Sequence, residues 1–158
     1  MHASLRPLVY FAAPLFSEAE LSFNDALALK LERFVDVFLP QRDGGKVVDL
    51  VDRGVTIRNA YSSIFDRDVE AIRQANAVFA VLDGRVVDEG VAFELGLAFA
   101  MGKTCVGFQS DSRRLLPIGN NPMIECALAS IFKNQSGVLD WARTYSESWS
   151  SRAVQHPA

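Results

Sequence analysis

Glu94 is the residue whose type and surroundings point most clearly to chemistry. Residues 88–98 read Asp-Glu-Gly-Val-Ala-Phe-Glu-Leu-Gly-Leu-Ala, a stretch that predicts a helix beginning just after a strand. Val91 lies three residues before Glu94 and Ala98 four after it, so the carboxylate is predicted on the apolar side of the helix. Removing an ionised carboxylate from water without partners costs several kcal/mol or raises its pKa. This placement favours a reactive carboxylate, with a buried glutamate paired to arginine or tyrosine as the structural alternative.

Two glycines flank this carboxylate at Gly90 and Gly96. Each costs a helix about 1 kcal/mol relative to alanine. Glycine is useful where another backbone or a ligand must come close. We therefore expect a ligand to approach this helix, which makes Gly90 a candidate binding residue.

Three aspartates are further candidates. Asp68 lies on a predicted helix, three residues after Phe65 and four before Ile72, so it shares their apolar stripe. Asp83 directly follows a strand-like apolar run, and Asp88 stands at the start of the Glu94 helix. Their structural alternatives are a boundary carboxylate bonded to a loop, a turn residue and an N-cap, respectively. Asp88 and Glu94 are less than two helical turns apart and are expected to line one pocket.

Other chemistries are disfavoured by composition. The only two histidines, His2 and His156, lie near the termini, which argues against Ser-His-Asp, Cys-His and histidine-based zinc sites. The net charge is −3 and the basic residues are scattered, so no nucleic-acid footprint is predicted. No apolar run reaches the roughly 18 residues that span a bilayer, and a cytoplasmic enzyme is expected. Cys105 and Cys126 lie in apolar segments, which favours reduced core thiols over a disulfide.

The spacing of apolar residues predicts the elements that position these groups. Strands are expected at 8–12, 35–39, 77–82, 104–108 and 131–132, and helices after Ser17, at about 56–74, from 88, near Pro122 and at 137–148. The helix over 56–74 is expected to turn Ile64, Phe65, Val69 and Ile72 inward. Residues 41–56 and 110–121 are predicted loops, and the tail from about 149 to 158 is predicted to be loosely held.

This alternation predicts one α/β domain over residues 1–158, with a doubly wound parallel sheet of about five strands, as in flavodoxin or Rossmann-like folds. Ligands bind outside the carboxyl ends of strands in such sheets. Residues 10–16, 83–88 and 109–111 fall at that edge. Residues 110–114 read Ser-Asp-Ser-Arg-Arg, which fits a phosphate site or, more simply, a solvated loop. No Gly-x-Gly-x-x-Gly or P-loop lysine motif occurs, so classical dinucleotide or NTP binding is not supported.

Taken together, these motifs resemble the nucleoside 2-deoxyribosyltransferase family over about residues 7–125. The marks are the first strand and loop at 10–16 (Tyr-Phe-Ala-Ala-Pro-Leu-Phe), the helix start Asp88-x-Gly90-x-x-x-Glu94, and Asn121-x-Met123. The helix-start pattern after an apolar strand is the specific part of this resemblance, because Asn-x-Met alone carries no weight.

The resemblance implies a role for each matching residue. Glu94 would be the nucleophile at C1′ of a 2′-deoxyribonucleoside, Asp88 would bind the sugar hydroxyls and orient Glu94, and Asp68 would move the proton that the leaving base needs. Tyr10 and Phe16 would line the nucleoside pocket, and Gln41 would contact the base. Asp83 is a further substrate-binding candidate because of its place at the carboxyl edge of the sheet. Asn121 and Met123 would reach into a neighbouring subunit's site, so a homo-oligomer is expected.

The physical chemistry fits this reading independently. A carboxylate captures an oxocarbenium-like centre as a covalent glycosyl-enzyme, and an aspartate supplies the proton in a site without histidine. The substrates would be a deoxynucleoside and a free nucleobase, with no cofactor and no metal. The C-terminal residues 151–158 do not resemble the family ending whose carboxylate enters the site.

Two other functions remain open at this stage. The first is an N-glycoside hydrolase acting on nucleosides or nucleoside 5′-monophosphates, in which water replaces the acceptor base. That enzyme would need a phosphate cradle, and Arg113 and Arg114 keep it in play. The second is a non-catalytic nucleotide-sensing module, against which the joint presence of Glu94, Asp88 and Asn121 argues.

Overall fold

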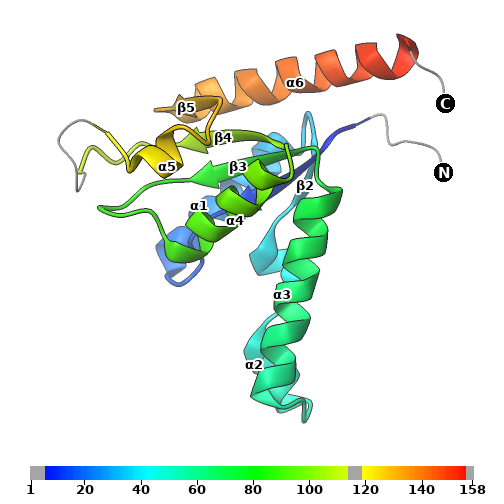
Figure 1. Ribbon diagram of the computed structural model, residues 1–158, viewed down its shortest axis with the longest axis vertical. Helices are drawn as coiled ribbons and strands as arrows, with labels where there is room; N and C mark the ends of the chain where they lie inside the picture. The colour runs from blue at the N-terminus through cyan, green and yellow to red at the C-terminus, as the bar shows by residue number, and fades with distance from the viewer. Residues whose placement is uncertain (1–5, 114–118, 156–158) are drawn as a thin grey trace.

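Five parallel strands form the centre of the protein. The computed structural model describes residues 6–113 and 119–155. The strands pair in the order β2-β1-β3-β4-β5 (Figure 1), and their bounds are β1 Leu8–Ala12, β2 Asp36–Phe38, β3 Ala77–Val81, β4 Thr104–Phe108 and β5 Ser130–Phe132. All four pairings are parallel. Strand β2 is added on one side of β1, and β3, β4 and β5 follow on the other side, so the predicted doubly wound sheet is confirmed.

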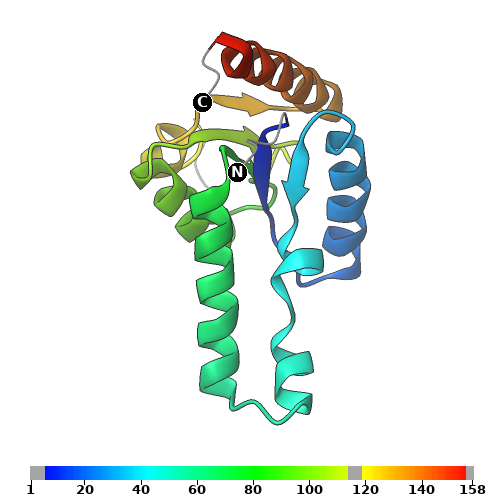
Figure 2. The same cartoon turned by 90° about the vertical axis from the view of Figure 1, so that its right-hand side faces the viewer.

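Helices cover both faces of the sheet (Figures 1 and 2). One face carries α1 (Glu18–Leu31) and α6 (Gln135–Gln155), and the other carries α3 (Ile57–Gln74), α4 (Glu89–Ala100) and the short α5 (Pro122–Glu125). Successive strand residues point to opposite faces. Thus Phe11 and Phe79 pack with α1 and α6, while Tyr10 and Val78 pack with α3 and α4.

An arm projects from this body (Figure 2). It consists of the π-helix η1 (Pro40–Gly44), α2 (Val47–Asp52) and the N-terminal part of α3. Residues 41–56 were predicted as a loop, and most of them are helical instead. Helix α2 has six residues, none of them buried, so its apolar pattern is too short to distinguish it from a loop. Arg67 donates to the carbonyls of Asp43 and Gly44, which joins η1 to α3.

Several predicted details need correction. Phe65 was expected to face inward but is 53% exposed, although Ile72 on the same helix is buried. The last helix runs to Gln155, so residues 150–155 are helical where a loose tail was predicted, and residues 156–158 lie outside the described part. Cys105 is buried as expected, whereas Cys126 is exposed, and both thiols are free.

Within the described ranges, 6–113 and 119–155, no helix combines the length and the hydropathy that crossing a bilayer would require.

Candidate active site

Helix α4 positions Glu94 beside the carboxyl edge of the sheet. Asp88 caps the helix, and its Oδ1 accepts hydrogen bonds from Gly90 N at 2.9 Å and Val91 N at 3.1 Å. Val91 and Leu95 are buried against the sheet and fix the rotation of the helix about its axis. That rotation turns Glu94 toward α3, where its side chain lies partly buried.

Tyr10 holds the Glu94 carboxylate. Tyr10 lies on β1 and is fully buried, and its hydroxyl donates to Glu94 Oε1 at 2.5 Å. The ring stacks on Phe38 with the two centroids 5.5 Å apart. Because neighbouring rings and strands fix the tyrosine, the hydroxyl aims the carboxylate in one direction. The pKa of Tyr10 is raised above its usual range, by burial first and by the charge of Glu94 second, so the hydroxyl remains a donor.

Asp68 faces the same depression from α3. This hollow has a volume of about 280 Å³, and its lining residues are Phe65, Asp68, Val69, Ile72, Gly90, Phe93, Glu94 and Leu97. Among the described residues, Asp68 Oδ1 is the one buried side-chain oxygen or nitrogen without a hydrogen-bond partner. A buried carboxyl oxygen of this kind is costly unless something else bonds to it. The missing partner and the place of Asp68 in the lining make it a candidate acid–base group.

Burial shifts the proton affinity of both carboxyl groups upward. It raises the pKa of Glu94 to about 7, with further increases from the charges of Asp68 and Asp88 and a decrease from the Tyr10 hydrogen bond. Burial also raises the pKa of Asp68 to about 6, against a decrease from the nearby Arg67. Both groups titrate close to neutral pH, which suits a nucleophile and an acid–base pair.

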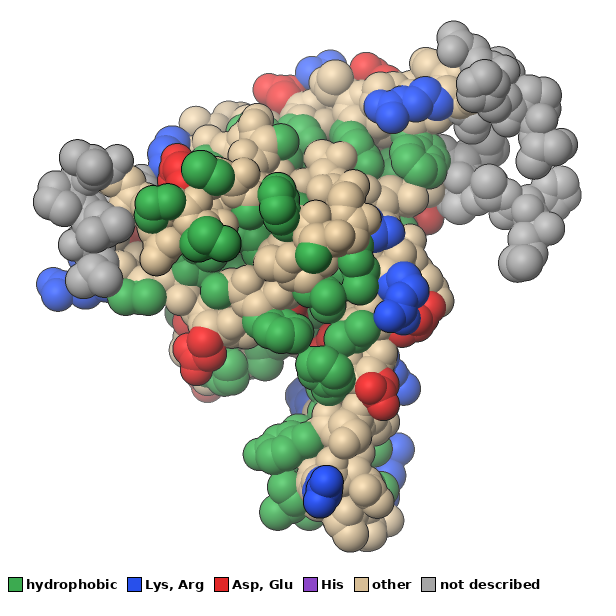
Figure 3. Space-filling model, viewed as in Figure 1, with side chains coloured by type: hydrophobic (Ala, Val, Ile, Leu, Met, Phe, Trp, Pro, Cys, Tyr) green, Lys and Arg blue, Asp and Glu red, His purple; other side chains and the backbone are tan. Residues whose placement is uncertain are grey.

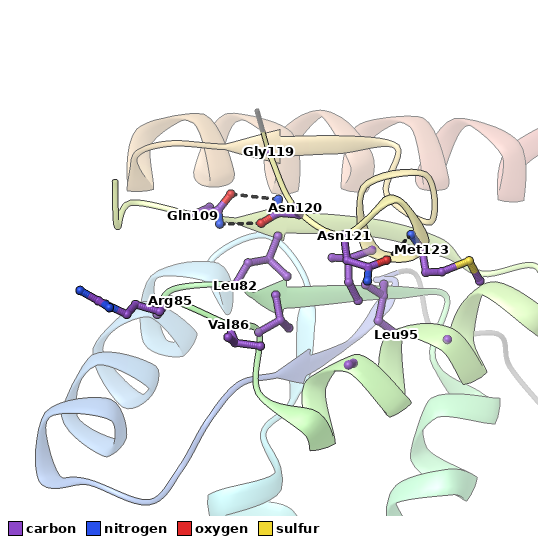
Figure 4. Close-up of a pocket in the computed structure, with 14 residues that line it drawn as sticks. Leu82, Arg85, Val86, Leu95, Gln109, Gly119, Asn120, Asn121 and Met123 are labelled. Carbon is purple, nitrogen blue, oxygen red and sulfur yellow. Dashed lines mark hydrogen bonds between the residues drawn. The ribbon is translucent and has the colours of Figure 1, made fainter. Parts of the chain in front are cut away.

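A second and larger cavity lies on the other flank of α4 (Figure 4). Its volume is about 520 Å³, and its lining residues are Leu82, Gly84, Arg85, Val86, Val87, Ala92, Leu95, Gly96, Gln109, Gly119, Asn120, Asn121, Met123 and Ile124. None of these 14 described residues is a carboxylate. The larger cavity thus has volume without acid–base groups, and we place the chemistry in the smaller one.

Asn121 and Met123 belong to this larger cavity and not to the Glu94 depression. Asn121 caps α5 by accepting from Met123 N at 2.9 Å, and the Met123 side chain is 81% exposed (Figure 4). Gln109 and Asn120 bond to each other through both amides, at 2.9 and 3.1 Å. Within one chain, α4 therefore separates Asn121 and Met123 from the nucleophile candidate.

Of the remaining candidates, Gln41 and Phe16 do not line the Glu94 depression, whereas Gly90 does. The Gln41 amide bonds to Leu21 O, Asn24 and Asp25 of α1, so the structure does not bring it to the Glu94 depression. Phe16 is 78% exposed and lines neither cavity. Gly90 lines the Glu94 depression as expected. A Cβ at Gly90 would lie 3.1 Å from Asp88 Oδ1, so a larger residue at this position would crowd the carboxylate that caps α4.

The loop after β4 is organised by carboxylates. Asp83 accepts from Ser110 N at 2.6 Å, Asp111 N at 2.8 Å and Ser110 Oγ at 2.7 Å. Arg113 pairs with Asp111, and this ion pair lowers the pKa of Asp111 to about 2. Arg114, the other cation of the predicted phosphate site, lies outside the described residues.

Two contacts were missed by sequence reasoning. Gly44 in η1 packs so closely on Asp68 that a Cβ there would lie 3.0 Å from its Oδ1. Phe65 and Phe93 form an exposed aromatic rim on the Glu94 depression, with ring centroids 6.0 Å apart. The Gly44-Gly45 pair is the signal that was available for the first contact, since paired glycines in a loop mark close backbone approach.

Comparisons with known proteins identify the family and the fold. Residues 9–144 match the family model for nucleoside 2-deoxyribosyltransferases. The fold is similar to that of a 2-deoxyribosyltransferase from Bacillus psychrosaccharolyticus, at 24% identity and a TM-score of 0.72 over 88% of this chain and 95% of that one. It is also similar to a 2-desoxiribosyltransferase from Leishmania mexicana, at 21% identity and a TM-score of 0.60 over 89% and 97%.

A more distant structural likeness is the CMP N-glycosidase BcmB from Clostridium botulinum. It shares 18% identity and a TM-score of 0.54 over 85% of this chain and 96% of that one. The search of curated proteins finds no match. At these identities the likeness to solved structures shows the fold alone.

Proposed function

This chain belongs to the nucleoside 2-deoxyribosyltransferase family, and from that premise we propose that it transfers 2-deoxyribose between nucleobases. The observation that carries the proposal is the Tyr10-bound Glu94 carboxylate, which shares one depression with the unpartnered Asp68. A nucleophile and a proton donor on one face are what cleavage of an N-glycosidic bond requires.

The proposed first step forms a covalent intermediate. A Glu94 oxygen attacks C1′ as the bond from C1′ to the base nitrogen breaks, and the electron pair of that bond leaves with the base. Asp68 gives its proton to the departing base. The products are a free base and a deoxyribosyl ester of Glu94, and the Tyr10 hydroxyl keeps its bond to the other carboxylate oxygen.

The second step reverses the first with a different base. A nitrogen of the incoming base attacks C1′ on the face from which the first base left, and the ester oxygen of Glu94 departs with its electron pair. Asp68 takes the proton that this nitrogen loses. Two inversions at C1′ give overall retention.

The other site residues receive supporting roles in this proposal. One oxygen of Asp88 caps α4, so we assign the sugar hydroxyls to its second oxygen. Gly90 leaves space for the sugar, and Tyr10 lines the pocket. For Phe16 and Gln41 the family resemblance alone suggests a substrate contact, and for Asp83 its position directly after β3 does. The contacts of these residues in the structure do not add to these assignments.

We further propose that a second copy of the chain completes each site. The Glu94 depression is shallow, and its rim residues Phe65 and Phe93 are 53% and 56% exposed. Ile57 and Tyr61 extend this apolar surface along the arm, and Figure 3 shows apolar side chains gathered on the arm and on the body beside it. Surfaces of this kind mark contacts between proteins. In the assembly, Asn121 and Met123 of one copy would cover the depression of the other, and light scattering should report more than one subunit.

The test of the transfer activity is a chromatographic assay. The protein is incubated with deoxyinosine and free adenine, and deoxyadenosine, hypoxanthine and free deoxyribose are quantified. Deoxyadenosine formed in step with hypoxanthine release supports transfer. Conversion of neither substrate at any pH between 5 and 8 would refute the proposal.

Hydrolysis is the second candidate, and the open rim of the depression in a single chain, without a covering copy, favours it. Glu94 lies in a shallow hollow with an exposed rim, so water has access to a glycosyl ester formed there. The likeness to a CMP N-glycosidase fits the same chemistry. In the assay above, hydrolysis would release free deoxyribose and no deoxyadenosine.

A further inference from the structure

Arg67 precedes Asp68 on α3, and its guanidinium binds the end of η1. The Nη1 atom donates to the carbonyl oxygens of Asp43 and Gly44, at 3.4 and 3.3 Å. The next residue, Gly45, has a φ of 90° and comes so close that a Cβ there would lie 3.4 Å from the same Nη1 atom. One charged donor therefore fixes the turn that leads from η1 into the arm.

The same turn forms one wall around the candidate acid. Gly44 is buried, and a Cβ added to it would lie 3.0 Å from Asp68 Oδ1. That oxygen has no hydrogen-bond partner among the described residues. Because Arg67 binds the carbonyl of Gly44 and Gly44 packs on Asp68, the guanidinium sets the position of the backbone against the carboxyl group.

Arg67 also brings a positive charge close to Asp68. Burial raises the pKa of Asp68 to about 6, and the charge of Arg67 opposes that rise. The other ionisable side chains at this carboxyl group are Glu94 from α4 and Tyr10 from β1, while η1 presents the backbone of Gly44. Among the residues that the structure describes, no carboxylate forms an ion pair with Arg67, so its charge remains available to Asp68.

The guanidinium acts from behind the site. Arg67 does not line the Glu94 depression, and it lines instead a hollow of about 180 Å³ between η1, α2 and α3. It therefore touches neither the sugar nor the base in the proposed reaction. An effect of this residue on catalysis has to pass through Asp68 or through the η1 backbone.

We propose that Arg67 is a positioning residue for the proton transfer assigned to Asp68, an inference that rests on the proposed function. Arg67 holds the Gly44 backbone against the acid and keeps a cation beside it. When Asp68 gives its proton to the departing base, the carboxyl group becomes negatively charged, and the nearby guanidinium stabilises that charge. The contact between the arm and α3 thus sets the strength of the acid.

A titration without substrate tests the proposal separately from turnover. The pKa of Asp68 is measured in the full chain from the carboxyl carbon signals by NMR, and its signal is assigned by its absence in Asp68→Asn. Arg67→Gln removes the charge, and Arg67→Lys keeps it. The matched control is Arg58→Gln, because Arg58 is an exposed arginine of the same helix and its loss changes the net charge equally.

Arg67→Gln should raise the pKa of Asp68 by at least about 0.5, because the carboxylate loses its cation. The alkaline limb of the kcat/KM profile should move to higher pH by the same amount. Compared at the pH optimum of each variant, kcat/KM should also fall about fivefold, since the acid is less firmly placed. Arg67→Lys should stay within about twofold of the wild type, and Arg58→Gln should change neither the pKa nor the profile.

Two results of the titration would overturn the proposal. They are an unchanged pKa of Asp68 in Arg67→Gln, and a rise in Arg58→Gln as large as in Arg67→Gln. A loss of activity in Arg67→Gln that leaves the pH profile in place and is not restored by Arg67→Lys would overturn it as well, because the role would then be structural only. If Arg67→Gln does not fold, Arg67→Met takes its place with the same expected rise.

The two proposals fail in different ways. The expected rise in the pKa of Asp68 without base exchange in the chromatographic assay would refute the transfer function and leave the effect of Arg67 on Asp68 standing. Base exchange with an unchanged pKa in Arg67→Gln would refute this inference and leave the transfer function standing.

Discussion

The two flanks of α4 differ in what they offer a ligand. The flank toward α3 holds Glu94 and Asp68 in a hollow of about 280 Å³, and the flank toward α5 holds amides and Arg85, but no carboxylate, in a cavity of about 520 Å³. One flank has the acid–base groups and the other has the volume. Cavity size alone would therefore have directed attention to the side of the helix whose lining holds no carboxylate.

This separation explains why a second copy is needed in our account. The α5 flank carries Asn121 and Met123 at its exposed surface, where they are available to another molecule and not to Glu94 of the same chain. Chemistry and substrate enclosure thus come from different faces of one helix. Substitutions on one flank of α4 at a time separate these two contributions.

The largest effect is expected from Glu94→Gln. Removal of the nucleophile should lower base exchange by at least about 1,000-fold, or about 4 kcal/mol. The chain should also become more stable at high pH. The pKa of Glu94 is raised to about 7 on folding from an ordinary 4.5, so ionisation destabilises the folded wild type as the pH rises through this range.

Chemical denaturation at several pH values checks the second effect. Well above pH 7, the free energy of unfolding of Glu94→Gln should exceed that of the wild type by roughly 3 kcal/mol, because folding raises the pKa of Glu94 from 4.5 to about 7. The difference should vanish below about pH 4.5. A variant that unfolds more readily than the wild type at pH 8 would mean that Glu94 has a structural role. Glu89→Gln, on the exposed side of the same helix, is the control.

Asp68→Asn should reduce kcat/KM by about 100-fold, because the leaving base loses its acid. The wild-type pH profile should be bell-shaped, with apparent pKa values for the pair near 6 and 7. The variant should lose the alkaline limb. Its acidic limb should move to lower pH, since the charge of Asp68 raises the pKa of Glu94. Asp66→Asn, an exposed neighbour on α3, should leave both limbs in place.

Tyr10→Phe should lower the rate by about 20-fold at neutral pH, because a hydrogen bond to a charged group contributes about 1.5–3 kcal/mol. That bond lowers the pKa of Glu94, so its loss should shift the acidic limb of the profile to higher pH. The phenyl ring retains the stacking on Phe38. A reduced rate with an unmoved pH profile would contradict the positioning role of the hydroxyl.

Asn121→Ala should cost about tenfold in kcat/KM, the loss of one hydrogen bond to substrate. The sharper experiment mixes this variant with Glu94→Ala after reversible dissociation of the subunits. If Asn121 acts in the neighbour's site, half of the sites in each mixed dimer are intact. Random pairing should then restore about a quarter of wild-type activity. No recovery would place Asn121 outside the neighbour's site.

The smallest effect is expected from Gly44→Ala. The added Cβ would lie 3.0 Å from Asp68 Oδ1, so the carboxyl must shift by a few tenths of an ångström. Activity should fall about threefold, because a small displacement of the acid weakens proton transfer. The control is Gly96→Ala, because a Cβ added at Gly96 would meet no atom within 4 Å. Gly54→Ala is not suitable, because its φ of 86° strains any side chain.

Much of this arrangement was predictable from the sequence. The apolar run at 77–82 indicated a central strand, and the spacing around Glu94 indicated a carboxylate on the inward side of a helix. The capping role of Asp88 and the capping box of Ser17 and Glu20 are local effects that residue type alone reveals. Such features depend on neighbours within one or two helical turns.

The rest depends on long-range contacts. Gln41 is held by α1, whose residues lie 16 to 20 positions away, and no local pattern predicts that bond. Phe65 follows the apolar spacing of α3 yet lies on the rim of the depression, because α3 extends past the sheet that would otherwise bury it. The arm and the exposed aromatic rim therefore became visible only in three dimensions.

The most direct test of the central claim is intact mass spectrometry after a rapid acid quench. The protein is mixed with a deoxynucleoside in the absence of an acceptor base, and the adduct is mapped by peptide digestion. We predict a gain of one deoxyribosyl group on the peptide that contains Glu94, and none in Glu94→Gln. A deoxyribosyl adduct on another residue, or base exchange at the wild-type rate in Glu94→Gln, would contradict the account.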